Sequence, residues 1–231
     1  MSIGGFLIQK KKALTLLFPE KGLKEFNLQT IGGNSGRSNQ SGSSKRILTK
    51  RRISLLQNGG VIIFNEMLGI KEIDDKKGRI NNREAVRAVI IQNNKILMVH
   101  SNLGDYKFPG GGVEKNESHA EGLMREVAEE TGYLNGLVGD KMGVVIERHL
   151  DDYDKDAVFQ MTSHYYLYEL TDEKVVVQQL DDYESEQEYT PKWVKLEDAI
   201  KQNQTILNQC EQNVWIHREN FVLTELKKIM S

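Results

Sequence analysis

The stretch from Gly110 to Tyr133 joins a glycine-rich turn directly to a short helix, and this join constrains the fold more than any other part of the sequence. Ser118 and Glu121 have the spacing of a capping box, which begins a helix, and Gly132 supplies the residue that ends one. The sequence therefore predicts a helix of about three and a half turns. Its apolar stripe consists of Ala120, Leu123, Met124 and Val127. We expect this stripe to pack against a sheet.

The other face of the predicted helix is acidic. Glu126, Glu129 and Glu130 stand at i, i+3 and i+4, so their carboxylates lie within one turn of each other. Like charges at this spacing repel, and Arg125, which can reach Glu129, offsets only part of the repulsion. Because no His or Cys shares this face, the oxygen ligands favour Mg²⁺ or Mn²⁺ over zinc. A solvated acidic surface is the alternative interpretation of the helix alone.

The residues before the helix, Pro109 to Gly112, include three consecutive glycines. Glycine allows positive φ angles and a close approach of the backbone to a ligand, so this turn can face a cation or a phosphate. Together, Gly111, Glu117 and the run from Arg125 to Tyr133 resemble the Nudix box, with every spacing intact. Tyr133 is the one departure, because the family usually has an aliphatic residue there. The departure concerns packing at the helix exit and not the acidic face.

The resemblance implies a role for each residue of the acidic face. Glu126, Glu129 and Glu130 would bind Mg²⁺ together with the backbone carbonyl of Gly110, and one of these glutamates would activate or orient the attacking water. Arg125 would hold a catalytic glutamate in place. The implied reaction is Mg²⁺-dependent hydrolysis of a phosphoanhydride bond in a nucleoside diphosphate derivative or a nucleoside triphosphate. A carboxylate cluster with Mg²⁺ suits this reaction, because it neutralises a diphosphate and activates water.

The chain from residue 83 onward has the pattern of a sheet with helices. Runs rich in Val and Ile predict strands, and Asn93-Asn94 is a turn pair between the first two. The expected strands are 85–91, 95–100, 138–150, 157–170, 175–177 and 191–196. After Leu196 the apolar residues recur at helical spacing. These elements agree with the α/β/α sandwich of mixed sheet that the resemblance implies for about residues 83–231.

Charge is distributed unevenly along the chain. Residues 1–60 hold 11 Lys and Arg against 2 Glu, a net charge of +9, and the remainder holds 20 against 31, a net charge of −11. Residues 32–44 have the composition of a flexible linker, and the basic run 45–52 has no aromatic residue to stack on bases. We therefore expect a basic, largely disordered extension over residues 1–66 and a Nudix hydrolase domain over residues 67–231. One hypothesis is that Met67 is the true start.

Several classes of protein are disfavoured by composition. No apolar run approaches the roughly 20 residues of a membrane-spanning helix, and the N-terminal apolar segment lacks the pattern of a signal peptide. Cys210 is the single cysteine, which excludes an internal disulfide and is interpreted as a buried structural thiol. We therefore expect a cytoplasmic protein with no membrane partner.

The sequence leaves the substrate and several site residues open. The resemblance implies that a fourth acidic ligand often comes from another loop, but each candidate here is better interpreted as a solvated surface carboxylate. These candidates are Glu147, Glu186 and Glu188. Aromatic residues that could stack on a base, or pack in the core, are Tyr106, Phe108, Tyr165, Tyr166 and Trp193. None of the five histidines has metal-ligand spacing with another.

Two further functions are weighed against a hydrolase of small nucleotides. A non-catalytic module could sense a nucleotide or bind nucleic acid through the basic extension, but every carboxylate of the box is present, which disfavours it. An RNA 5′-end pyrophosphohydrolase would use both the box and the extension, and the sequence does not exclude it. A homo-oligomer is likewise left open.

Overall fold

The computed structural model describes residues 62–72, 79–154, 156–209 and 214–230. The basic extension as far as residue 61, its linker and Cys210 lie outside these ranges, so the predictions made for them stay predictions. None of the helices among the described residues is long and apolar enough to cross a membrane.

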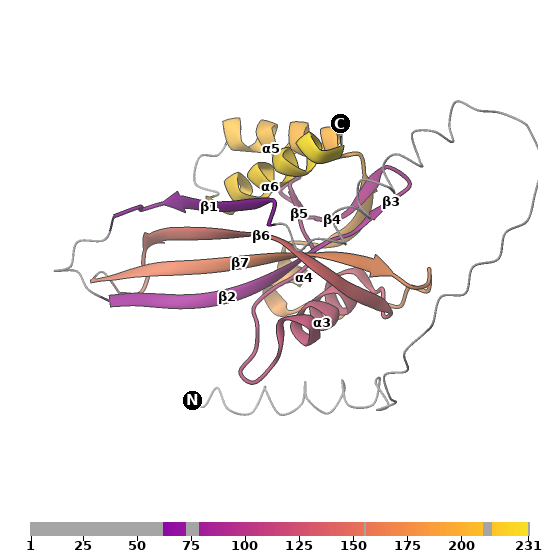
Figure 1. Cartoon of the computed structure of the whole chain (residues 1–231), viewed down its shortest axis with the longest axis horizontal. Helices are drawn as coiled ribbons and strands as arrows, with labels where there is room; N and C mark the ends of the chain where they lie inside the picture. Colours follow the sequence, from indigo (N-terminus) through magenta and orange to yellow (C-terminus); the bar gives the residue numbers. More distant parts are fainter. Residues whose placement is uncertain (1–61, 73–78, 155, 210–213, 231) are drawn as a thin grey trace, which may run out of the picture. The chain divides into compact units, whose positions relative to one another are not determined.

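A mixed sheet spans the described part of the chain (Figure 1). Its strand order is β1 (Phe64–Gly69), β6 (Gly136–Leu150), β7 (Ala157–Leu170) and β2 (Arg79–Val89). β6 and β7 pair antiparallel at the centre, and β1 and β2 run parallel to their neighbours at the two edges. β7 is rich in aromatic and β-branched residues, as expected of a strand in the middle of a sheet. The predicted strands 138–150 and 157–170 therefore form the middle of the sheet.

A second sheet is built around β4 (Lys95–His100). β4 pairs antiparallel with β3 (Ile91–Gln92), β5 (Tyr106–Lys107) and β8 (Thr190–Val194). Asn93 and Asn94 have φ angles of 51° and 60°, which suits the tight turn predicted between β3 and β4. The prediction of a single strand over 85–91 is wrong, because the chain changes sheet at Ile90, between the end of β2 and the start of β3. Most of that segment pairs with β7 instead of β4.

Helices cover opposite sides of the sheets. α3 (His119–Thr131) contacts β2, β6 and β8, whereas α6 (Val214–Met230) contacts β1 and β5 and packs against α5 (Leu196–Gln209). Figure 1 shows α3 on one side of the strands and the α5–α6 pair on the other. A short helix, α4 (Asp182–Glu186), precedes β8. The predicted α/β/α sandwich of mixed sheet is confirmed.

The ends of α3 form as the sequence predicts. Ser118 and Glu121 make the reciprocal capping box, and Gly132 ends the helix in the left-handed conformation at φ 77°. Leu123 and Val127 are fully buried, but Ala120 is exposed. The prediction for Ala120 was wrong because the buried face of α3 begins only at Gly122.

β1 begins before the boundary expected at Met67. Phe64 is 5% exposed and packs edge to face against Tyr165 and Phe221, with ring centroids 5.5 and 6.0 Å away. The Ile63 amide donates a 2.7 Å hydrogen bond to the carbonyl of Met142. Residues 64–66, which the sequence assigns to the extension, thus form half of β1.

The segment expected as a strand at residues 175–177 makes only an isolated bridge. Val175 bridges Tyr133, and the Val176 amide donates a 2.9 Å hydrogen bond to the carbonyl of Gly132. This segment therefore follows the exit of α3 and joins neither sheet as a regular strand.

Buried charges tie α6 to both sheets. Glu219 is fully buried and accepts hydrogen bonds from the Phe108 amide at 3.1 Å and from the Arg218 guanidinium at 2.7 Å. Arg218 also pairs with Glu147 of β6. On α5, the Asn203 side chain accepts from the Tyr106 amide and donates to the Tyr106 carbonyl. These contacts fix the backbone just before the glycine turn.

Candidate active site

The glycine turn runs beside β2. The Val86 amide donates to the carbonyl of Gly111 at 3.0 Å, and the Ala88 amide donates to the carbonyl of Pro109 at 2.8 Å. Gly110 lies between them at φ 138°, where a Cβ would overlap the Val86 carbonyl. Only glycine fits this position, because both its backbone angle and the lack of space exclude a side chain.

The turn is bonded to the acidic face of α3. The Gly110 amide donates a 2.7 Å hydrogen bond to Oε2 of Glu130. A Cβ at Gly111 would overlap the carboxylate of Glu126, so the absence of a side chain makes room for that group. The carbonyl of Gly110, which the resemblance assigns to the metal, accepts a hydrogen bond from the Arg87 guanidinium. The turn thus packs directly against two carboxylates of the box.

Three carboxylates converge beside the turn. Glu126, Glu130 and Glu184 each offer an oxygen, and these atoms all lie within 4.8 Å of one another. Glu126 and Glu130 are 8% and 4% exposed, and Glu184 is half-buried. Gathering three negative charges away from water is unfavourable without a cation among them. The arrangement therefore fits a divalent cation with hard oxygen ligands.

Burial and the close approach of the carboxylates to one another raise the pKa of two of these groups. Burial raises the pKa of Glu130 well above its usual range, and the charges of Glu126 and Glu184 raise it further, against the opposing effects of Arg87 and the Gly110 amide. Burial also raises the pKa of Glu184, with contributions from neighbouring carboxylates that include Glu129. A cation at this place would oppose these shifts by favouring the charged carboxylates.

Arg125 organises the other side of the acidic face. Its guanidinium donates to both oxygens of Glu117 at 2.9 and 3.0 Å, to Glu126 at 2.7 Å and to Glu129 at 3.2 Å. Burial alone would lower the pKa of Arg125, but its hydrogen bonds and charge interactions with Glu117 and Glu126 outweigh burial and raise it. Glu129 therefore lies against Arg125 and is not one of the three converging residues. These contacts suit the positioning role that the resemblance implies for Arg125.

Glu184 is not among the residues that the sequence offered as a further acidic ligand. Among the candidates, Glu147 pairs with Arg218 in the core, and Glu186 and Glu188 are exposed. None of these candidates belongs to the acidic groups that come together in the described part of the chain, whereas Glu184 does. Glu184 has one local signal, the capping box that it forms with Asp181. That signal predicts a helix start and gives no indication of the approach to α3.

A cation and several aromatic rings lie close to the acidic group. Lys107 Nζ sits 4.2 Å from the ring centroid of Trp215 and 4.6 Å from that of Tyr189, and it hydrogen-bonds to the Tyr189 hydroxyl. The Tyr183 ring is 5.6 Å away. Burial lowers the pKa of Lys107, while the charges of Asp105, Glu219 and Glu130 raise it and that of Arg87 lowers it. These contacts place a partly buried ammonium group against aromatic rings.

The aromatic residues expected to stack on a base mostly serve packing. Phe108 and Tyr165 are fully buried and meet edge to face at 5.4 Å. Trp193 Nε1 donates to the Tyr133 hydroxyl at 3.2 Å, which gives the unusual last residue of the box a partner. Tyr106 packs against His100, and Tyr166 bonds His119.

Comparisons with known proteins agree on one family. The model of the NUDIX domain matches residues 81–213, more than half of the chain. No curated protein matches the chain.

Three solved structures illustrate how partial the structural similarity is. The chain is 18% identical to a UDP-X diphosphatase, with a TM-score of 0.38, over 64% of this chain and 60% of that one. It is 18% identical to a NUDIX hydrolase from Nitrosomonas europaea, with a TM-score of 0.41, over 63% and 91% of the two chains. For an Ap4A hydrolase from C. elegans the identity is 16% and the TM-score 0.40, over 64% and 98%. Since all three TM-scores are below 0.5, the assignment of the chain to a family rests on the match to the NUDIX domain model and not on these structures. The prediction of a Nudix hydrolase is confirmed at the level of the family: the chain belongs to the NUDIX domain family.

Proposed function

We propose that the protein is a Mg²⁺-dependent hydrolase that cleaves a phosphoanhydride bond in a nucleoside diphosphate derivative or a nucleoside triphosphate. One observation carries this proposal: carboxylate oxygens of Glu126 and Glu130 on α3 and of Glu184 on α4 all lie within 4.8 Å of one another. Like charges repel at this separation, whereas a hard divalent cation among them would be bound by several carboxylate oxygens.

The donor set fits magnesium rather than a softer metal. All three groups are carboxylates, and Mg²⁺ prefers oxygen ligands. Mn²⁺ would fit the same set. The bound ion would neutralise charge on the diphosphate and make water a better nucleophile.

The other residues of the box prepare the site for this chemistry. The Gly110 amide holds Glu130 in place, and Arg125 holds Glu126 and Glu129. Glu129 lies outside the converging group, so its carboxylate is our candidate to accept a proton from the attacking water. Arg125 then acts by fixing the direction of that carboxylate.

Binding of the substrate would use the side chains next to the acidic group. The charge of Arg87 lowers the pKa of Glu130, and the charge of Glu130 raises the pKa of Lys107, so both cations lie near this carboxylate. They are therefore placed to bind phosphate oxygens beside the metal. Trp215 and the exposed Tyr183 offer rings on which a base can stack. This combination favours a small nucleotide as substrate.

The test is release of phosphate or pyrophosphate from a panel of nucleoside triphosphates and nucleoside diphosphate conjugates, with the full-length protein, with and without Mg²⁺. Release that depends on Mg²⁺ supports the hydrolase and identifies the substrate class. If no substrate in the panel releases phosphate or pyrophosphate while a nucleotide still binds, the protein is a non-catalytic nucleotide-sensing module and the proposed hydrolase is wrong.

A further inference from the structure

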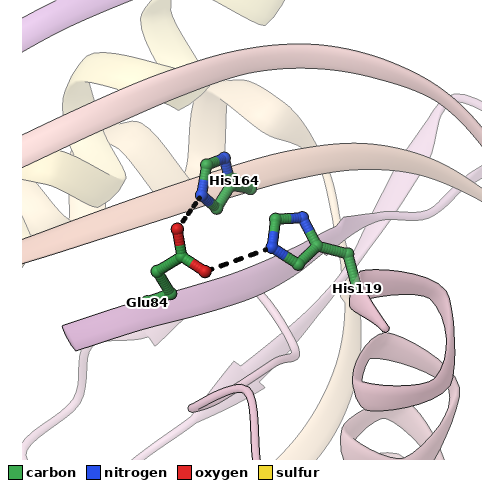
Figure 2. Close-up of side chains that lie close together, drawn as sticks. All are labelled: Glu84, His119 and His164. Carbon is green, nitrogen blue, oxygen red and sulfur yellow. Dashed lines mark hydrogen bonds and ion pairs between the residues drawn. The ribbon is translucent and has the colours of Figure 1, made fainter. Parts of the chain in front are cut away.

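A second group of side chains comes together where β2, β7 and the start of α3 meet. Glu84 of β2, His119 of α3 and His164 of β7 each offer one ligand atom, and these atoms lie within 4.8 Å of one another. Figure 2 shows both imidazole rings directed at the Glu84 carboxylate, each toward a different oxygen. Nε2 of His119 is 3.5 Å from Oε2, and Nε2 of His164 is 3.6 Å from Oε1. The group shares no residue with the acidic site.

His164 has an unusual environment for a buried histidine. The residue is 8% exposed, and neither ring nitrogen has a hydrogen-bond partner among the described residues. The 3.6 Å separation from Glu84 is too long for a hydrogen bond. A buried polar atom without a partner costs free energy, so most buried histidines find one. A ligand between His164 and Glu84 would supply it.

His119 is oriented by a second residue. The Tyr166 hydroxyl lies 2.8 Å from its Nδ1. When Nδ1 carries the proton and donates to this hydroxyl, the lone pair of Nε2 points toward Glu84 and His164. Histidines that bind metals are typically held in this way, with the second nitrogen donating to an oxygen.

We propose that Glu84, His119 and His164 form a binding site for a divalent transition metal, most suitably Zn²⁺, which is separate from the acidic site on α3. Three ligands at zinc distances of about 2.1 Å would be about 3.4 Å apart in a tetrahedral site. The separations of the two Nε2 atoms from Glu84, 3.5 and 3.6 Å to its two different oxygens, are close to this value, and one ligand atom from each residue lies within 4.8 Å of the other two. Small side-chain movements would complete the geometry.

The chemistry of the donors distinguishes this site from the acidic one. Two imidazoles and one carboxylate favour zinc and similar metals, whereas Mg²⁺ prefers oxygen ligands alone. The Glu84 side chain is 58% exposed, so water can reach a fourth position on the metal.

A metal here would fasten the glycine turn. Its ligands come from β2, β7 and the first turn of α3, and the Glu84 carbonyl accepts a 3.1 Å hydrogen bond from the Val113 amide. The chain between Val113 and His119 connects the turn to the helix. Binding would therefore hold both ends of that connection, and we expect it to stabilise the fold around the active site.

The experiment is calorimetric titration of Zn²⁺ into the full-length protein in excess Mg²⁺, which keeps the acidic site occupied by the harder ion. We expect one equivalent of Zn²⁺ to bind the wild type. His119→Ala and Glu84→Gln should each weaken this binding at least about tenfold. Added Zn²⁺ should raise the Tm of the wild type but not that of either variant.

His217→Ala is the matched control, because His217 is exposed on α6 and lies outside the group. It should leave Zn²⁺ affinity unchanged. Glu84→Gln alters an exposed side chain and should fold, which keeps the test valid even if His119→Ala does not. Equal Zn²⁺ affinity in the wild type, Glu84→Gln and His217→Ala would overturn the proposal, and so would the lack of any stoichiometric uptake by the wild type.

Discussion

The backbone amide of Gly110 and the carboxylate of Glu130 are joined by a 2.7 Å hydrogen bond across twenty positions of the sequence. This bond places the glycine turn against the acidic face of α3, next to Glu126 and Glu184. A buried carboxylate in this position needs both a donor and a nearby cation. The turn supplies the donor, and the proposed metal supplies the positive charge.

Glu184 should contribute to the affinity for Mg²⁺. In Glu184→Gln one of three converging carboxylates loses its charge, so we expect the Kd for Mg²⁺ to rise about tenfold or more. Calorimetric titration with Mg²⁺ measures this directly. Glu186→Gln, two residues away on the same short helix but exposed, is the control and should bind like the wild type. Equal effects of the two substitutions would remove Glu184 from the site.

Glu219→Ala should destabilise the fold strongly. The substitution leaves the Phe108 amide and part of the Arg218 guanidinium without a partner in the core, and breaking a buried ion pair costs about 3–5 kcal/mol. Urea unfolding gives the change. Glu225→Ala on the same helix removes only the surface pair with Lys228 and should cost at most about 1 kcal/mol. A comparable loss in both variants would show that burial of Glu219 is not the cause.

Phe64 should anchor β1. Replacing a buried phenylalanine with alanine costs about 3–5 kcal/mol, and Phe64 loses two edge-to-face ring contacts as well. Urea unfolding of Phe64→Ala measures the loss, and Ile62→Ala, at a residue 48% exposed, should stay near the wild type. A protein shortened to begin at Met67 should be destabilised similarly. Full stability of the shortened protein would instead support the hypothesis that the domain starts at Met67.

Asp105→Asn should stabilise the protein in a pH-dependent way. Burial raises the pKa of Asp105 above 3.8, despite the hydrogen bond from Ser101. The folded state therefore binds this proton more tightly, so its contribution to stability is complete below the unfolded pKa and is lost as the pH rises through the folded pKa. The asparagine avoids that loss, so its Tm should exceed that of the wild type at about pH 7, and the gap should narrow toward about pH 4.

Thermal unfolding across this pH range checks the prediction. Asp152→Asn, at an exposed carboxylate, is the control and should show no such trend. A gap between Asp105→Asn and the wild type that stays constant from acid to neutral pH would mean that titration of Asp105 is not responsible.

Local patterns in the sequence predicted the parts of the fold that are determined locally. The caps of α3 at Ser118 and Gly132 depend on neighbouring residues, and both formed as expected. The turn at Asn93-Asn94 is also local. The same runs of Val and Ile did not reveal that the chain changes sheet at Ile90, because pairing depends on distant partners.

The candidate site residues also divide into those that local spacing predicts and those that only the fold brings together. Glu126 and Glu130 could be placed together from helical spacing alone. Glu184 approaches them only after the chain has folded, and its sequence neighbours indicate a helix start and nothing more. The histidines illustrate this further, since His119 and His164 are far apart in sequence but have ring centroids 4.5 Å apart. Spacing along the chain cannot show such a pair.

The most direct test of the proposed function is the turnover number of Glu130→Gln with Mg²⁺, measured on whichever substrate the panel identifies. Glutamine keeps an oxygen to accept the Gly110 hydrogen bond and relieves the crowding of carboxylates, so the fold should be retained, as Tm would show. A carboxylate ligand that supports metal catalysis is worth several kcal/mol, and we expect kcat to fall about 10²–10⁴-fold. A folded Glu130→Gln with wild-type turnover would contradict the account.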